Sequence, residues 1–142
     1  MLVRCLYASR PAPAFKPSDL DRILEQSRRN NPERGITGLL CVAGNLFLQV
    51  LEGGRGEVCE LYNAIVRDDR HQQATLLTFE EISERRFANW TMGQVNIERL
   101  NPALLLKYFP RAELDPFKGS GRAALSLLTE LVDTAALSLR GG

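Results

Sequence analysis

The sequence lacks several features that mark common classes of protein. No apolar run approaches the ~20 residues that a helix needs to span a bilayer, and the first residues lack the basic, then apolar pattern of a secretory signal. Lysine and arginine total 18 against 17 acidic residues, so the basic excess typical of a nucleic-acid surface is absent. We therefore expect a cytoplasmic protein that binds neither nucleic acid nor a membrane.

Cysteine and histidine are also scarce. The chain has three cysteines, Cys5, Cys41 and Cys59, and a single histidine, His71, with no CxxC pair. A zinc site needs several such ligands in close spacing, so we expect no metal site. An odd number of cysteines, well separated in sequence, indicates reduced thiols rather than disulfides.

The chain does have the composition of a globular domain. Of its 142 residues, 44% are hydrophobic and 25% are charged, which suits one domain with a core. Apolar spacing and turn residues predict the elements that follow. The predicted strands are residues 2–7, 36–42, 46–51 and 74–82 with a weaker one at 90–97, and the predicted helices are residues 18–31, 58–66, 101–109 and 122–139.

The order of these elements predicts an α+β fold. The first six match the βαββαβ order of a ferredoxin-like sandwich, in which the first and third strands are central and both helices cover one face. The two C-terminal helices are expected to cover the other face, with a partner subunit as their alternative target. The predicted plan is a ferredoxin-like domain with a fifth strand at residues 1–98 and a helical extension packed on the sheet at 99–142.

Polar side chains converge on one predicted face of the sheet. Gln49 lies inside an apolar strand, where an unpaired amide would cost ~1–3 kcal/mol. Strand alternation places Tyr7 and Gln49 on one face, and Ser27 and Asn31 lie four residues apart at the end of the first helix. This pattern is typical of a small-molecule pocket. A Tyr7–Gln49 pair that satisfies itself in a core is the alternative.

Five stretches of sequence, taken together, resemble a known family. They are LYAS at residues 6–9, NNP with GITGLL within residues 30–40, NLFLQVLEG at 45–53, DDRH at 68–71 and RRFANWTM at 85–92. In this order they resemble the BLUF domains, blue-light sensors that bind FAD, over residues 2–94. Beyond residue 100 the chain is similar to the short, single-domain members, so no output enzyme domain is expected.

The resemblance implies specific roles for residues of this chain. It implies that residues 1–98 bind FAD non-covalently, with FMN or riboflavin as substitutes in recombinant protein. Tyr7 would donate an electron and a proton, and Gln49 would bridge it to the flavin. Trp90 and Met92, which the spacing places on one face of the last strand, would relay the signal. The other residues expected near the flavin are Asn31, Ser27, Ser9, Ile23, Phe47, Arg70 and His71.

The resemblance thus implies a photoreceptor rather than an enzyme. Light-driven electron and proton transfer from Tyr7 through Gln49 would rearrange the hydrogen bonds to the flavin. The signal would then pass to an unidentified partner protein, and homo-oligomerisation is left open. The alternative function is a ferredoxin-like ligand-binding or scaffold domain without photochemistry.

Two other activities of this topology are disfavoured by the sequence. An acylphosphatase needs a glycine-rich loop after the first strand, where this chain has residues 9–13, SRPAP. An RNA-binding module needs exposed aromatic residues on its central strands, where this chain has Cys5 and Leu48.

Overall fold

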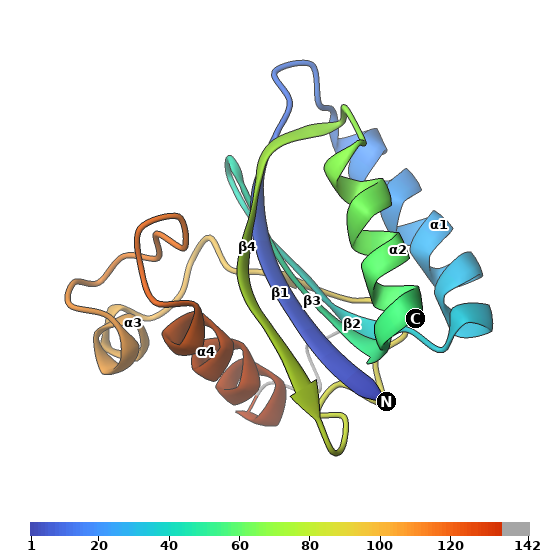
Figure 1. Ribbon diagram of the computed structural model, residues 1–142. Helices are drawn as coiled ribbons and strands as arrows, with labels where there is room; N and C mark the ends of the chain where they lie inside the picture. Colours follow the sequence, from blue (N-terminus) through green and yellow to red (C-terminus); the bar gives the residue numbers. More distant parts are fainter. Residues whose placement is uncertain (135–142) are drawn as a thin grey trace.

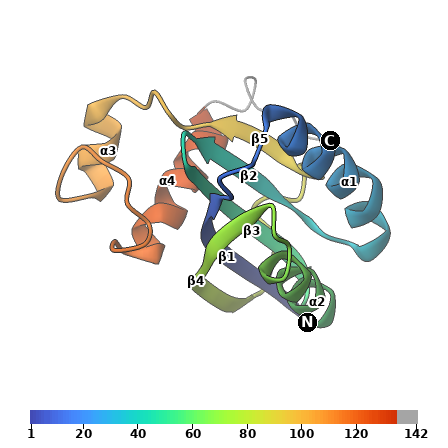
Figure 2. The same ribbon diagram turned by 90° about the horizontal axis from the view of Figure 1, so that it is seen from above.

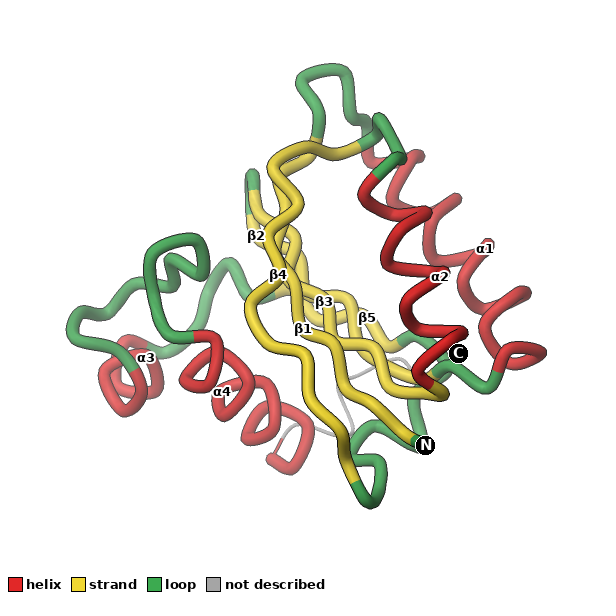
Figure 3. Tube along the Cα trace, in the orientation of Figure 1, coloured by secondary structure: helices red, strands yellow, loops and turns green. Residues whose placement is uncertain are grey.

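The computed structural model describes residues 1–134 as a sheet with a layer of helices on each face (Figure 1). Helices α1 (Pro17–Arg34) and α2 (Arg55–Val66) cover one face, and α3 (Pro102–Tyr108) and α4 (Gly121–Thr134) cover the other, as the tube in Figure 3 also shows. In chain order the elements are β1 (Leu2–Pro11), α1 (Pro17–Arg34), β2 (Thr37–Ala43), β3 (Leu46–Gly54), α2 (Arg55–Val66), β4 (His71–Ile82), β5 (Gly93–Asn96), α3 (Pro102–Tyr108) and α4 (Gly121–Thr134).

The sheet has the predicted ferredoxin-like topology. Its strand order is β4-β1-β3-β2-β5, so the first and third strands are central, as seen from above in Figure 2. Strands β4, β1, β3 and β2 pair antiparallel, whereas β5 adds to the β2 edge in parallel. The α+β prediction with a fifth strand is therefore confirmed.

Alternation along the central strands divides the core into two parts. Leu6, Leu48 and Val50 point to the α3–α4 face, where α4 contributes buried leucines such as Leu127 and Leu128. The intervening positions of the same strands point to the α1–α2 face. Because side chains of successive strand residues alternate between faces, each strand serves both layers.

The first helix differs from its prediction at both ends. It begins at Pro17, so Ser18 lies inside the helix, and it runs through Pro32 to Arg34 instead of stopping. Pro32 stands in the last turn, where its missing N–H removes only one helical hydrogen bond. Gly35, with a φ of 68°, then ends the helix in the left-handed conformation that glycine adopts without strain.

The last strand is shorter than predicted. Only Gly93–Asn96 pairs with β2, and Trp90 and Met92 precede it in a bent segment. The Gly38 N–H donates to the Trp90 carbonyl at 2.8 Å, which directs this segment onto β2 just before regular pairing begins. The prediction that Trp90 and Met92 share one face of a strand is therefore wrong.

The C-terminal helices pack on the chain's own sheet, as predicted. Asn101 caps α3 by accepting from the Ala103 N–H at 2.9 Å. Buried leucines of α4 join the core under β1 and β3. The predicted continuation of this helix to Leu139 lies outside the described residues. The domain boundary at residue 98 stays a prediction.

The approach of β2 to β3 supplies a test of the fold. A Cβ on Gly38 would lie 2.0 Å from the Val50 carbonyl oxygen. This oxygen belongs to the backbone of β3, so moving it would disturb the sheet. We expect Gly38→Ala to lower the free energy of unfolding by roughly 2–3 kcal/mol, measured by urea denaturation. The control is Gly56→Ala in α2, because a Cβ there meets nothing within 4 Å. It should be neutral or raise stability by up to about 1 kcal/mol. Equal losses in both variants would contradict the packing argument.

Candidate functional site

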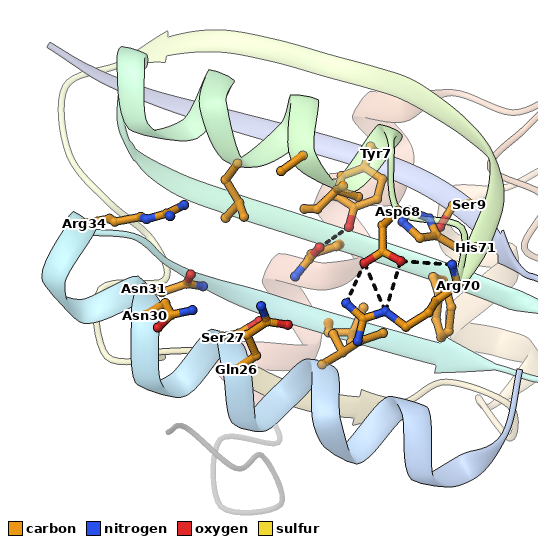
Figure 4. Close-up of a pocket in the computed structure, with 17 residues that line it drawn as sticks. Tyr7, Ser9, Gln26, Ser27, Asn30, Asn31, Arg34, Asp68, Arg70 and His71 are labelled. Carbon is orange, nitrogen blue, oxygen red and sulfur yellow. Dashed lines mark hydrogen bonds and ion pairs between the residues drawn. The ribbon is translucent and has the colours of Figure 1, made fainter.

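A pocket lies between α1 and α2, above the central strands (Figure 4). Its floor comes from β1, β2 and β3, its walls from the two helices, and one end from the segment that follows α2. The structure brings together in this pocket every residue that the sequence assigned to cofactor binding, namely Tyr7, Ser9, Ile23, Ser27, Asn31, Phe47, Gln49, Arg70 and His71. Their contact with a cofactor stays a prediction.

The side of α1 that faces the pocket follows from helical spacing. Ile23, Ser27 and Asn31 lie four residues apart and so form one stripe along the helix. The pocket also contains a parallel stripe that the sequence reasoning missed, Gln26, Asn30 and Arg34. The same four-residue spacing is the signal that could have found it. The other lining residues it missed are Leu40, Leu61, Ala64, Ile65 and Asp68.

A chain of polar contacts runs along the pocket floor. The register of β1 on β3 sets Tyr7 opposite Gln49, and the Tyr7 hydroxyl donates to Gln49 Oε1. The Gln49 Nε2 amide donates in turn to the sulfur of Met92 at 3.2 Å. All three side chains are buried. Because thioether sulfur is a weak acceptor, the Gln49 amide retains hydrogen-bonding capacity toward the pocket.

Burial controls the protonation of Tyr7. The Tyr7 side chain is almost fully enclosed, and this burial raises the pKa of its hydroxyl well above the usual range. The rings of Tyr7 and Tyr62 pack in a T-shaped arrangement, with centroids 5.5 Å apart. Tyr7 is therefore a neutral phenol that donates to Gln49 across the neutral pH range.

Met92 and Trp90 pack on opposite faces of the sheet. Met92 is fully buried within the core under α1 and α2, beside Gln49. Trp90 is partly buried and packs against the core under α3 and α4. Because the segment before β5 is bent rather than extended, residues two apart do not share a face. Met92 is thus the member of the pair that lies against Gln49 of the pocket floor.

Three buried polar atoms around the pocket have no hydrogen-bond partner within residues 1–134. They are Asn31 Nδ2, Ser9 Oγ and His71 Nδ1. Each such atom costs ~1–3 kcal/mol when it stays unpaired. A ligand with a polar edge would remove this cost. The Tyr7–Gln49 pair is satisfied by its own contacts, so these three atoms are the separate feature of the pocket that favours a polar ligand.

Charged residues close one end of the pocket. Arg70 Nη2 and Asp68 Oδ2 are 2.5 Å apart, and Figure 4 shows them beside His71, far from Arg34 and Asn31. The hydrogen bond from Arg70 holds the pKa of Asp68 below its usual range. Burial lowers the pKa of His71, so the imidazole is neutral at pH 7.

None of the cysteines lines the pocket. Burial raises the pKa of the Cys5 and Cys41 thiols to about 12, so both remain protonated and unreactive. Within residues 1–134 all three cysteines are free, and no cluster of potential metal ligands occurs. In the same part of the chain, no helix has the length and apolarity required to cross a bilayer.

Comparison with known proteins supplies the family. Residues 2–93 match the family model described as BLUF, sensors of blue-light using FAD. The chain is 32% identical over 100 residues to the photoactivated adenylate cyclase subunit beta of Euglena gracilis. The matched region covers 70% of this chain and 12% of that protein. The match therefore spans about an eighth of that relative's length.

Several solved structures match nearly the whole chain. The structure of BlsA in its photo-activated state has a TM-score of 0.84 and 31% identity, and the match covers 93% of this chain and 95% of that one. The dark-state structure of the BLUF protein BlrB has a TM-score of 0.76 and 32% identity, with coverage of 94% and 96%. The sequence, the fold and the pocket agree, and this chain belongs to the BLUF family of blue-light sensors.

Proposed function

We propose that this chain is a blue-light photoreceptor that holds FAD non-covalently between α1 and α2 and switches through Tyr7 and Gln49. The observation that carries the proposal is the contact chain from Tyr7 through Gln49 to Met92, which leads from the pocket floor to a loop outside it. The family membership supports the flavin, and the three unpaired polar atoms support a polar ligand in this pocket.

The residues of the pocket fit a flavin. A flavin ring has apolar faces and a polar edge of carbonyl and nitrogen atoms, and it therefore needs apolar walls with a few donors. Ile23 and Ile65 supply walls from the two helices. Asn31 would hold the carbonyl edge with its unpaired Nδ2, and Gln49 would bond the ring beside Tyr7. FMN and riboflavin share this ring and would occupy the same place.

The proposed photochemistry uses contacts that exist before illumination. When bound, a photoexcited flavin supplies a strong oxidant. Tyr7 would give up an electron to that oxidant, which would acidify its hydroxyl, and the proton would leave through Gln49, whose Oε1 the hydroxyl already contacts. The electron and the proton both return to Tyr7, so no covalent bond forms and the cysteines take no part. The lasting change is the hydrogen-bonding arrangement of Gln49.

Met92 would convert that change into movement. Its sulfur accepts from Gln49 Nε2 but has no hydrogen to donate. If the Gln49 amide rotates, its oxygen faces the sulfur and the contact is lost. Met92 is then free to move away from Gln49 and to displace the segment that carries Trp90.

The signal would leave on the other face of the sheet. Trp90 packs against the core shared with α3 and α4, and α3 presents a leucine, Leu106, that is 56% exposed. We assign the output to contact between this face and an unidentified partner protein, with no reaction catalysed by this chain. Size-exclusion profiles of dark and illuminated protein test self-association as the output, and identical profiles would exclude it.

A light-minus-dark absorption spectrum tests the function directly. Protein purified with added flavin should be yellow and should shift reversibly to longer wavelength under blue light. Protein that stays colourless after flavin supplementation would contradict the proposal and would favour a scaffold domain.

Removing one oxygen tests the role of Tyr7. Tyr7→Phe should still bind flavin, because the ring keeps its packing, but the red-shifted state should be abolished because the donor to Gln49 is gone. The control is Tyr62→Phe, which alters the neighbouring ring that does not line the pocket. A normal photocycle in Tyr7→Phe would overturn the assignment.

Asn31 should control flavin affinity. Its buried Nδ2 has no protein partner within the described residues, so Asn31→Ala removes a hydrogen bond that only a ligand can make. We expect the dissociation constant for FAD to rise by roughly tenfold, measured by flavin fluorescence titration. Asn63→Ala on the exposed side of α2 is the control and should leave affinity unchanged. Unchanged affinity in Asn31→Ala would place the ligand elsewhere.

The photocycle should be insensitive to pH around neutrality. Burial raises the pKa of Tyr7 above the usual value of about 10, so the hydroxyl keeps its proton throughout this range. The amplitude of the light-minus-dark spectrum should therefore be constant between about pH 6 and about pH 9. A loss of amplitude with a midpoint inside that interval would show that another titrating group controls the switch.

A further inference from the structure

A buried carboxylate lies on the sheet face away from the pocket. Glu52 on β3 is 0% exposed and stands opposite Arg4 of β1 in the strand register. Its Oε2 accepts from Arg4 Nε at 2.7 Å, and a second Arg4 nitrogen donates to Glu80 at 3.0 Å. Buried charges require partners, so Arg4 explains how the carboxylate is tolerated.

The same carboxylate also holds the backbone of the loop between β4 and β5. Glu52 Oε1 accepts the Phe87 N–H at 2.7 Å, and Oε2 accepts the Arg86 N–H at 3.1 Å. Two successive amides therefore bind one ionised group, and hydrogen bonds to ionised groups are the stronger kind. Beside them, Arg85 donates to the Thr37 hydroxyl at 3.1 Å.

This loop is the one that carries Met92. At its far end the Arg28 Nε donates to the Met92 carbonyl at 3.2 Å, and the Gly38 N–H holds the Trp90 carbonyl. The loop is thus attached to the sheet near its start, through Glu52, and near its end it is attached to β2 through Gly38 and to α1 through Arg28. Between the two attachments it passes from the α3–α4 face to the α1–α2 face of the sheet.

We infer that Glu52 is a positioning residue whose carboxylate anchors the start of the β4–β5 loop and so keeps Met92 against Gln49. Glu52 and Gln49 are three residues apart on β3 and point to opposite faces. One strand therefore carries both Gln49, the proposed switch, and Glu52, which holds the loop that bears Met92. The inference deepens the proposed function and rests on it for the role of Gln49.

The two methionines of the chain allow the exposure of Met92 to be measured directly. Met1 is 56% exposed and Met92 is 0% exposed, so oxidation by dilute hydrogen peroxide measures Met92 exposure with Met1 as an internal reference. Trp90 is the only tryptophan, so its emission reports on the same loop. Neither readout requires a photocycle.

The test uses Glu52→Gln in the full chain. The substitution keeps the size of the side chain but replaces an acceptor oxygen with an NH₂ group that faces N–H donors. We expect Met92 to oxidise about fivefold faster or more relative to Met1. Trp90 emission should shift to longer wavelength. With FAD bound, dark recovery should slow, because Met92 returns to Gln49 less readily.

The control is Glu80→Gln, which removes the charge of the other partner of Arg4 but touches no loop amide. It should match the wild type in Met92 oxidation and dark recovery. Urea unfolding of both variants measures general destabilisation, which by itself leaves the dark recovery of folded molecules unchanged. Glu52→Asp is the second variant, for use if Glu52→Gln does not fold. It keeps a negative charge near Arg4, but its shorter side chain withdraws the carboxylate from the loop amides. It should also speed Met92 oxidation.

The possible results separate the anchor from the proposed function. If a folded Glu52 variant shows the Met92 oxidation rate and the dark recovery of the wild type, the positioning role of Glu52 is overturned. This holds regardless of how the photochemistry turns out. Absence of flavin binding or of a photocycle in the wild type would overturn the proposed function, while faster Met92 oxidation in Glu52→Gln would still support the anchor.

Discussion

The antiparallel register of β1 against β3 is the constraint on which the rest of the molecule depends. It sets Tyr7 opposite Gln49 and Arg4 opposite Glu52. Alternation sends the first pair to the α1–α2 face and the second to the α3–α4 face. A slip of one residue would exchange the faces of every side chain on one strand, so both polar pairs would be lost together.

The two faces of the sheet are covered in different ways. On one face α1 and α2 leave a pocket whose polar atoms lack protein partners. On the other, α4 packs leucines directly on the strands, and the buried charges are fully paired with each other and with loop amides. The β4–β5 segment contributes Met92 to the first face and Trp90 to the second, so it physically joins the pocket to the proposed output surface.

Local patterns were sufficient for much of the fold and the pocket. Period-two alternation, together with the predicted strand order, was enough to place Tyr7 and Gln49 on one face, and four-residue spacing was enough to align Ser27 with Asn31. Patterns failed to predict where helix α1 ends, because the effect of a proline depends on its position in the helix. Pro32 is a stop signal by its chemistry, but in the last turn it costs only one hydrogen bond, so the helix continues until Gly35.

The sequence by itself determined the order of the elements, the faces of the central strands and the family motifs, because these depend on residues close together in the chain. Only the tertiary structure decided that Met92, and not Trp90, reaches Gln49, and that Glu52 holds the Phe87 amide 35 residues away. Both outcomes depend on the path of an irregular loop across the sheet. That path has no periodicity, and distant hydrogen bonds set it.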